Sequence, residues 1–127
     1  MTADNPALKD TFARHLGIET LSFKDGYAKV RLAVRPEFLN GAGLVHGGLI
    51  FTLADYAFAL AANAGEAPGL GINAGIQFTR AGQPGDELFA EAELVSKSKK
   101  LGTYRIVVTN QEGAVLASVQ AMAYFKT

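Results

Sequence analysis

The chain has 127 residues, the size of one domain, and we expect residues 1–127 to form a single domain. Hydrophobic residues make up 49% of the chain and charged residues 19%, which excludes an intrinsically disordered protein. Twelve basic residues balance twelve acidic ones, and this neutral charge argues against a dedicated nucleic-acid-binding protein. The absence of cysteine excludes a disulfide scaffold, a thiol nucleophile and a thiolate metal site.

The N-terminal region predicts one short amphipathic helix. Asn5-Pro6 suits a helix N-cap followed by proline at the first helical position, and Gly17 suits the helix end. Between them an apolar residue recurs every four positions, at Leu8, Phe12 and Leu16. Residues 1–9 contain no apolar run after a basic start, so they do not resemble a secretory signal, and a cytoplasmic location is expected.

A hairpin and a long apolar helix are predicted next. Residues 18–24 read as a strand, Asp25-Gly26 as a tight turn, and residues 27–34 alternate between apolar and polar side chains like a half-buried strand. The segment 47–64 is apolar on all sides, which indicates a buried helix. A membrane span is the alternative, but a charged Asp55 near the middle and the flanking strands argue against it.

Four further strands are expected at about residues 70–80, 86–96, 103–110 and 114–125. The breaks between them are short, which predicts a meander of antiparallel neighbours. The predicted fold is therefore α+β, with a curved antiparallel sheet wrapped around one central helix.

Asp55 is the only residue between His46 and Glu66 that carries a charge at neutral pH. A carboxylate in a buried helix must be paired, protonated or functional, and a structural hydrogen bond is the alternative to catalysis. Gly47-Gly48 precedes it at the expected helix start, where free amides and the helix dipole favour a developing negative charge. The same glycines would also simply permit close packing of the helix on the sheet.

The spacing of these groups has a geometric consequence. Gly47 and Asp55 lie eight residues apart, about 12 Å along one helix. One carbonyl group cannot touch both within a subunit, so a shared substrate requires two chains with antiparallel helices across a two-fold axis.

The segment NGAGLVHGG at 40–48, followed by FTLAD at 51–55, resembles the signature of the PaaI-like hotdog acyl-CoA thioesterases. The resemblance covers almost the whole chain and implies a hotdog fold. It implies that Asp55 is the nucleophile or the general base that activates water, and that the Gly47 amide polarises the thioester carbonyl. Asn40 would orient the water or the carboxylate, and His46 would position the loop.

The resemblance also implies acyl-CoA substrates, including aromatic acyl groups, a homodimer often doubled into a homotetramer, and no metal or redox cofactor beyond the coenzyme A of the substrate. The two histidines, His15 and His46, lie far apart, which independently makes a metal site unexpected. One departure is Arg80-Ala81, where relatives often carry Arg-Pro. The candidate substrate-binding residues are Gly48, Tyr56, Ala59, Asn73, Arg80, Lys99 and Lys100, with Lys97 beside the last two.

Two other functions remain open from the sequence. A hotdog domain can bind acyl-CoA without cleaving it, although such a sensor usually has a fused output domain, for which 127 residues leave no room. A hydratase or dehydratase would pair a catalytic His46 with Asp55. Release of free CoA from acyl-CoA distinguishes a hydrolase from both alternatives.

Overall fold

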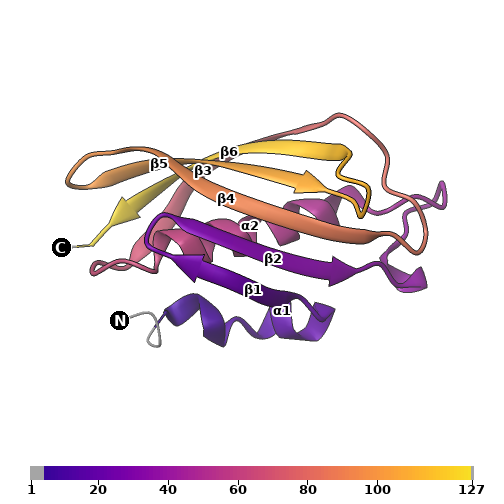
Figure 1. The fold of residues 1–127 in the computed structure, drawn as a ribbon, viewed down its shortest axis with the longest axis horizontal. Helices are drawn as coiled ribbons and strands as arrows, with labels where there is room; N and C mark the ends of the chain where they lie inside the picture. The colour runs from indigo at the N-terminus through magenta and orange to yellow at the C-terminus, as the bar shows by residue number, and fades with distance from the viewer. Residues whose placement is uncertain (1–4, 127) are drawn as a thin grey trace.

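A computed structural model of the protein describes the structure of residues 5–126. A curved six-stranded antiparallel sheet wraps around one long helix, α2 (Gly47–Ala62), in the α+β hotdog arrangement that the sequence predicts (Figure 1). The strands are β1 (Glu19–Lys24), β2 (Tyr27–Ala33), β3 (Gly69–Phe78), β4 (Glu87–Lys97), β5 (Leu101–Thr109) and β6 (Val115–Phe125). A 3-10 helix, η3 (Pro36–Phe38), lies in the connection from β2 to α2.

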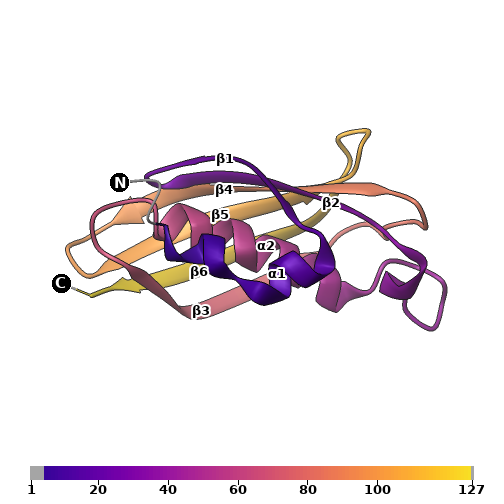
Figure 2. The ribbon, with the colours of Figure 1, turned by 90° about the horizontal axis from the view of Figure 1, so that it is seen from below.

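The N-terminal segment covers the side of α2 that faces away from the sheet (Figure 2). The single amphipathic helix expected there is wrong: a 3-10 helix, η2 (Pro6–Lys9), and a short helix, α1 (Thr11–Leu16), are separated at Asp10. Asp10 is extended, and its carboxylate accepts a hydrogen bond from the Ala13 N–H at 2.9 Å, which is an N-cap that starts a new helix. Leu8 and Phe12 are consequently exposed, and Ala13 and Leu16 are the residues of α1 that enter the core.

The strand order is β1-β2-β4-β5-β6-β3, and every neighbouring pair is antiparallel. The predicted meander is therefore wrong at its first step, because β3 pairs with β6 at the sheet edge and not with β4. The connection at 79–86 has eight residues, which reach about 26 Å when extended. Three strand spacings need only about 14 Å. The connection from β3 to β4 is therefore long enough to cross β5 and β6, although it is short.

The core lies between the inner face of the sheet and α2. The alternation predicted over residues 27–34 is confirmed, since Ala28, Val30, Leu32 and Val34 are all buried. The largest completely buried side chains come from β2, β4, β5, β6 and α2, and include Leu32, Leu53, Leu60, Leu88, Ile106 and Leu116. Because α2 packs against every strand of the concave face, the sheet fixes the orientation of the helix that carries Asp55.

One stripe of α2 stays open in the single chain. The expected burial of this helix on all sides is wrong for Gly48 and Asp55, which are exposed, and for Thr52 and Ala59, which are half-buried. These residues are spaced three or four positions apart and so share one face of the helix. With 16 residues α2 is about 24 Å long, and no helix within residues 5–126 is long and apolar enough to cross a membrane.

Candidate active site

The start of α2 holds a free backbone donor. His46 is the N-cap, and its ring Nδ1 accepts the Gly48 N–H at 2.8 Å while its carbonyl accepts the Leu49 N–H at 3.0 Å. The Gly47 N–H has no acceptor among residues 5–126. It therefore points from the positive end of the helix dipole with its hydrogen-bonding capacity unused, which suits the binding of a negatively charged oxygen.

Asn40 organises the loop that precedes this helix. Its side-chain carbonyl oxygen accepts hydrogen bonds from the Ala42 N–H at 2.9 Å and the Leu44 N–H at 3.1 Å. Its backbone N–H also bonds to the Leu44 carbonyl at 2.7 Å. The Nδ2 group makes no hydrogen bond within the described residues. Asn40 can thus act on a substrate or a water molecule only as a donor, because its acceptor already holds the loop.

Asn40 and Gly47 line a common pocket of about 430 Å³, which we call the amide pocket. Phe78, from the end of β3, forms one wall: a Cβ atom added to Gly47 would lie 3.3 Å from the ring atom Cζ of Phe78. A larger residue at position 47 would therefore crowd this ring. The complete lining is Asn40, Leu44, Val45, Gly47, Ile50, Phe78, Thr79, Arg80, Ala81 and Gly82.

Asp55 lies in a second pocket, of about 470 Å³, which we call the acid pocket. Its walls come from the middle and end of α2, from the first residues of β3 and from η2. The lining residues are Pro6, Ala7, Asp55, Phe58, Ala59, Ala62, Asn63, Gly69, Leu70 and Gly71. Asp55 is the only ionisable side chain in this list, so the pocket combines one carboxylic acid with small and apolar walls.

The surroundings of Asp55 favour its protonated form. Its carboxyl group is open to solvent on one side of the single chain, while protein excludes water from the other sides. This desolvation, together with the negative charge of Asp10, raises the pKa of Asp55 above its usual value. A carboxyl group with a raised pKa is a stronger base when ionised, as expected of a group that attacks a carbonyl or activates water.

Within one chain, no single substrate carbonyl can contact both Gly47 and Asp55. Neither lining contains both Gly47 and Asp55, and eight residues of helix separate the two by about 12 Å. His46 also lies away from Asp55, with its Nδ1 occupied by the cap. A His46–Asp55 pair of the kind that a hydratase would use is therefore not formed within the chain.

Tyr56 and Asn73 differ from the sequence-based expectation that they line the substrate pocket. Tyr56 is buried in the core, and its hydroxyl lies 2.9 Å from that of Thr20 on β1. Asn73 follows a bulge in β3 and lines a hollow elsewhere on the sheet, with Val95 and Arg105. Neither side chain reaches the amide or the acid pocket, because the helix and strand periods turn them to other faces.

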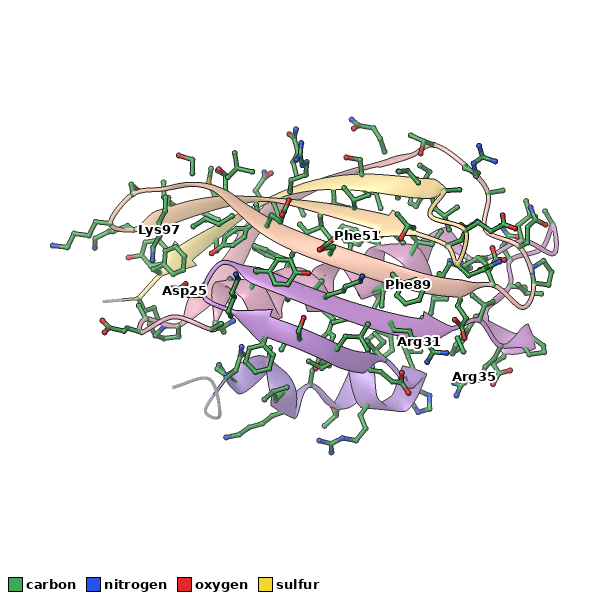
Figure 3. The ribbon with its side chains drawn as sticks, viewed as in Figure 1. Asp25, Arg31, Arg35, Phe51, Phe89 and Lys97 are labelled. Carbon is green, nitrogen blue, oxygen red and sulfur yellow. The ribbon has the colours of Figure 1, made fainter. Side chains whose placement is uncertain are left out.

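The basic candidates separate into two groups. Arg80 lines the amide pocket, and its N–H bonds to the carbonyl of Leu116. Lys99 and Lys100 lie in the β4–β5 turn, where the Lys100 carbonyl accepts the Phe125 N–H. The ten residues of β6 from 116 to 125 span about 30 Å. One coenzyme A phosphate cannot contact both groups in a single chain. Figure 3 shows Lys97 at the same end as this turn.

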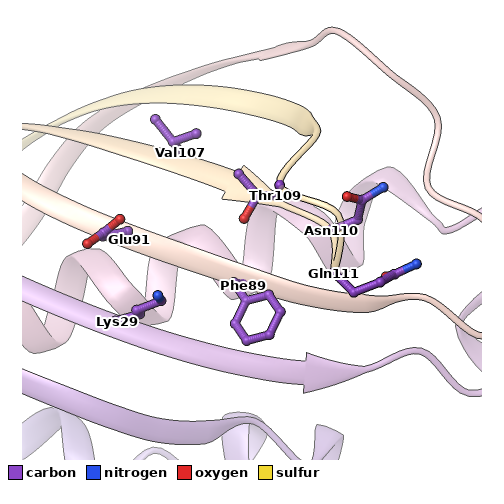
Figure 4. A pocket seen from close by; sticks show the side chains of 8 residues that line it. Lys29, Phe89, Glu91, Val107, Thr109, Asn110 and Gln111 are labelled. Carbon is purple, nitrogen blue, oxygen red and sulfur yellow. The ribbon is translucent and has the colours of Figure 1, made fainter.

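A further hollow lies on the outer face of the sheet, over β2, β4 and β5 (Figure 4). It measures about 250 Å³ and contains Lys29, Phe89 and Glu91 but none of the candidate catalytic residues. Glu91 accepts a hydrogen bond from the Tyr27 hydroxyl at 2.5 Å, which raises the pKa of Tyr27 to about 12. Because the Glu91 carboxylate already accepts this hydrogen bond, the hollow is a weaker candidate site than the pockets along α2.

Sequence reasoning missed several residues of the acid pocket. The sequence assigns Pro6 only to a helix start and places Phe58 only within the apolar helical segment 47–64, and it gives no role to Ala7. A signal was present in Gly69 and Gly71, since glycines inside a strand often mark a close approach: a Cβ atom on Gly71 would lie 2.8 Å from the Phe58 ring. Within residues 5–126 no cluster of three or more His, Asp or Glu side chains could hold a metal ion.

Comparison with known proteins agrees with this architecture. Residues 42–117 match the thioesterase superfamily. The acyl-coenzyme A thioesterase PaaI of Escherichia coli is 38% identical over 108 residues, which cover 85% of this chain and 77% of PaaI. The structure of the E. coli PaaI protein superposes with a TM-score of 0.93 over 99% of this chain and 94% of that one, at 32% identity.

Two more distant structures contain coenzyme A or its acetyl ester. A hypothetical thioesterase of Streptococcus pneumoniae with coenzyme A is 26% identical, with a TM-score of 0.87 over 94% of this chain and 96% of that one. A Streptococcus mutans protein bound to acetyl CoA is 25% identical, with a TM-score of 0.82 over 87% of this chain and 89% of that one. Sequence and structure together show that this chain belongs to the thioesterase superfamily, among its PaaI-like hotdog enzymes.

Proposed function

We propose that this chain hydrolyses acyl-CoA thioesters at a composite site formed by two copies of the chain. The Gly47 amide of one copy binds the thioester carbonyl oxygen, and Asp55 of the other attacks the carbonyl carbon or activates a water molecule to do so. The observation that carries the proposal is the pairing of an unused amide donor at a helix start with a desolvated carboxyl group of raised pKa.

The chemistry of the two pockets supports a thioester substrate. Attack on a thioester places a negative charge on the carbonyl oxygen, and a preorganised amide at a helix N-terminus stabilises that charge. Asp55 supplies the base or nucleophile, and the Asn40 Nδ2 group is free to hold water. The relatives support the same class: PaaI of E. coli is named an acyl-coenzyme A thioesterase, and two structures hold coenzyme A or acetyl CoA.

The open edge of β3 supports the dimer. Within residues 5–126 this ten-residue strand has one neighbour, and three of its large apolar residues, Leu70, Ile72 and Phe78, are each more than half exposed. A long apolar edge invites pairing with another strand. Antiparallel pairing of two β3 strands across a two-fold axis would make a continuous sheet and bring the amide pocket of one copy beside the acid pocket of the other.

The same pairing would resolve the separation of the basic groups. Arg80 lies at the end of β3 that follows Phe78, whereas Lys99 and Lys100 lie near its beginning, at Gly69. Reversing one strand against the other brings Arg80 of one copy toward the lysines of the second. We infer that these groups hold the coenzyme A phosphates, and that two dimers associate into a tetramer as the family resemblance implies.

Release of free CoA from acyl-CoA substrates, followed with a thiol reagent, tests the activity. Aromatic substrates such as phenylacetyl-CoA belong in the panel, since the E. coli relative comes from the phenylacetic acid degradation operon. Hydrolysis of at least one acyl-CoA with Asp55-dependent turnover is expected. Binding of acyl-CoA without CoA release would overturn the hydrolase proposal in favour of a sensor.

Subunit mixing tests the composite site. Asp55→Asn and Gly47→Pro each damage every site of a homodimer, and proline deletes the amide donor. In a mixed dimer one site carries both lesions and the other is intact. Random exchange makes half of the dimers mixed, so recovery of about a quarter of wild-type activity is expected. Folded parents that exchange subunits without recovering activity would show that the two groups do not meet across chains.

A further inference from the structure

The N-terminal segment forms part of the acid pocket. Pro6 and Ala7 of η2 line this pocket together with Asp55, although they lie about fifty residues away in the sequence. Figure 2 shows this segment running across the face of α2 that the sheet leaves uncovered. The substrate side of Asp55 is therefore bounded by a segment that belongs neither to the sheet nor to the motif helix.

Asn5 anchors this wall to the helix. It is 2% exposed, its Nδ2 group donates to the Leu60 carbonyl at 2.9 Å, and its Oδ1 accepts the Ala7 N–H at 3.0 Å. Leu60 lies in the last turn of α2, where carbonyl groups lack partners within the helix. One buried side chain thus caps a helix carbonyl and fixes the position of Ala7, so the wall is held at a defined distance from α2.

The composition of the pocket indicates which part of the substrate it takes. Phe58, Ala59, Ala62 and the glycines at 69 and 71 provide an apolar or narrow lining. Asp55 and the nearby Asp10 make the local charge negative, as the effect of Asp10 on the pKa of Asp55 shows. Phosphate groups would be repelled here, whereas an uncharged acyl group would bury apolar surface away from water. The pocket therefore fits the acyl end.

We propose that the N-terminal wall determines acyl specificity, with Ala7 setting how much space lies beyond Asp55 for the acyl group and Asn5 holding Ala7 in place. This inference rests on the proposed hydrolysis of acyl-CoA. It assigns a specificity-determining role to a segment outside the catalytic motif, and the small side chain at position 7 is the feature that keeps the pocket open.

Ala7→Leu tests the assignment because it adds three carbon atoms to the wall and retains the backbone bond to Asn5. We compare kcat/KM for acetyl-CoA, hexanoyl-CoA and phenylacetyl-CoA. One methylene group in an apolar pocket changes kcat/KM by about 10- to 200-fold, so the ratio of either larger substrate to acetyl-CoA should fall at least about tenfold. Thr11→Leu is the matched control, since Thr11 is exposed on α1 and lines none of the pockets described above. It should leave the ratios unchanged.

Three results would overturn the inference. An equal loss for all substrates would mean that Ala7→Leu only displaces Asp55, and unchanged ratios would mean that the acyl group lies elsewhere. The same change of ratio in Thr11→Leu would show an effect of surface apolarity. Ala7→Val, with a smaller change in the same direction, replaces the leucine variant if that one fails to fold. If the wild-type protein releases CoA from no substrate, the hydrolase proposal itself fails.

Discussion

At the scale of single residues, the candidate site contains two kinds of polar atoms: some already make hydrogen bonds within residues 5–126, and others have no hydrogen-bond partner there. The carbonyl oxygen of the Asn40 side chain and Nδ1 of His46 are committed to shaping the loop and the helix start. The Gly47 N–H and the Asn40 Nδ2 group have no partners among residues 5–126. The committed atoms hold the loop and the helix start in shape, and this shape positions the Gly47 amide and the Asn40 Nδ2 group.

Asp55→Asn should abolish most turnover and should not destabilise the fold. Partial desolvation by the surrounding protein, together with the charge of Asp10, raises the pKa of Asp55 above 3.8, so the folded protein binds its proton more tightly than the unfolded chain. Stability is therefore lost as pH rises from about that value through the raised pKa. The variant should melt at the same or a higher temperature at pH 7, and the difference should vanish near pH 3. Activity above about a tenth of wild type would exclude Asp55 from the mechanism.

Asn40→Asp and Asn40→Ala separate the two uses of the Asn40 side chain. Aspartate retains the acceptor for the Ala42 and Leu44 amides but loses the Nδ2 donor, whereas alanine loses both. We expect both variants to lower kcat and only alanine to lower the melting temperature, because an orienting donor acts in the transition state. An effect of Asn40→Asp on KM alone would contradict an orienting role.

At the scale of elements, the C-terminal end of α2 depends on distant segments of the chain. The Leu60 carbonyl is capped by the Asn5 side chain, and the Ala61 carbonyl accepts the Gly26 N–H of the β1–β2 turn at 3.2 Å. Helix ends need such partners because their last carbonyls have none within the helix. The N-terminal segment and the first hairpin thus hold the half of α2 that carries Asp55.

Asn5→Ala should weaken this arrangement. It leaves the Leu60 carbonyl without its buried donor, which costs about 1–3 kcal/mol of unfolding free energy. Denaturation by urea measures the loss, with Lys9→Ala, an exposed residue of the same segment, as the control. Faster hydrogen exchange should be confined to the N-terminal segment and the end of α2. A variant as stable as the wild type would mean that water replaces Asn5 at this carbonyl.

At the scale of the whole molecule, residues 5–126 form two separate pockets along α2 and leave one long apolar sheet edge open. The other edge of the sheet, β1, is shorter, with six residues, and carries charged side chains at both of its ends. Such features discourage strand addition. The asymmetry of the two edges is the reason why we expect assembly through β3.

Ile72→Lys tests this assembly by placing a charge on the β3 edge. Ile72 is exposed and lies at the bulge of β3, and Leu21 has the same properties on β1. Ile72→Lys should yield folded monomers without activity, because each pocket then lacks its complement. Leu21→Lys should retain the wild-type mass in light scattering and the wild-type activity. An active monomer of Ile72→Lys would refute the composite site.

The sequence by itself determined the elements after residue 17 and the chemistry that is local to one segment, while the N-terminal helix divides at Asp10. Alternation over 27–34, the apolar run after Gly47 and the spacing from Asn40 to Asp55 depend on neighbours in the chain, whose periodicity sets which face each side chain occupies. The motif also identified the family, which the comparisons confirm. These features are readable because residues close in sequence are constrained by the same backbone geometry.

Only the tertiary structure decided where separate segments meet. The position of β3 beside β6, the open stripe of α2 and the wall formed by Pro6 and Ala7 all depend on contacts between distant parts of the chain. A connection of eight residues reaches several strand positions equally well, and an Asn-Pro pair caps a helix whether or not its side chain reaches Leu60. The local sequence pattern is compatible with several strand pairings and several helix contacts. Packing around α2 selects one of them.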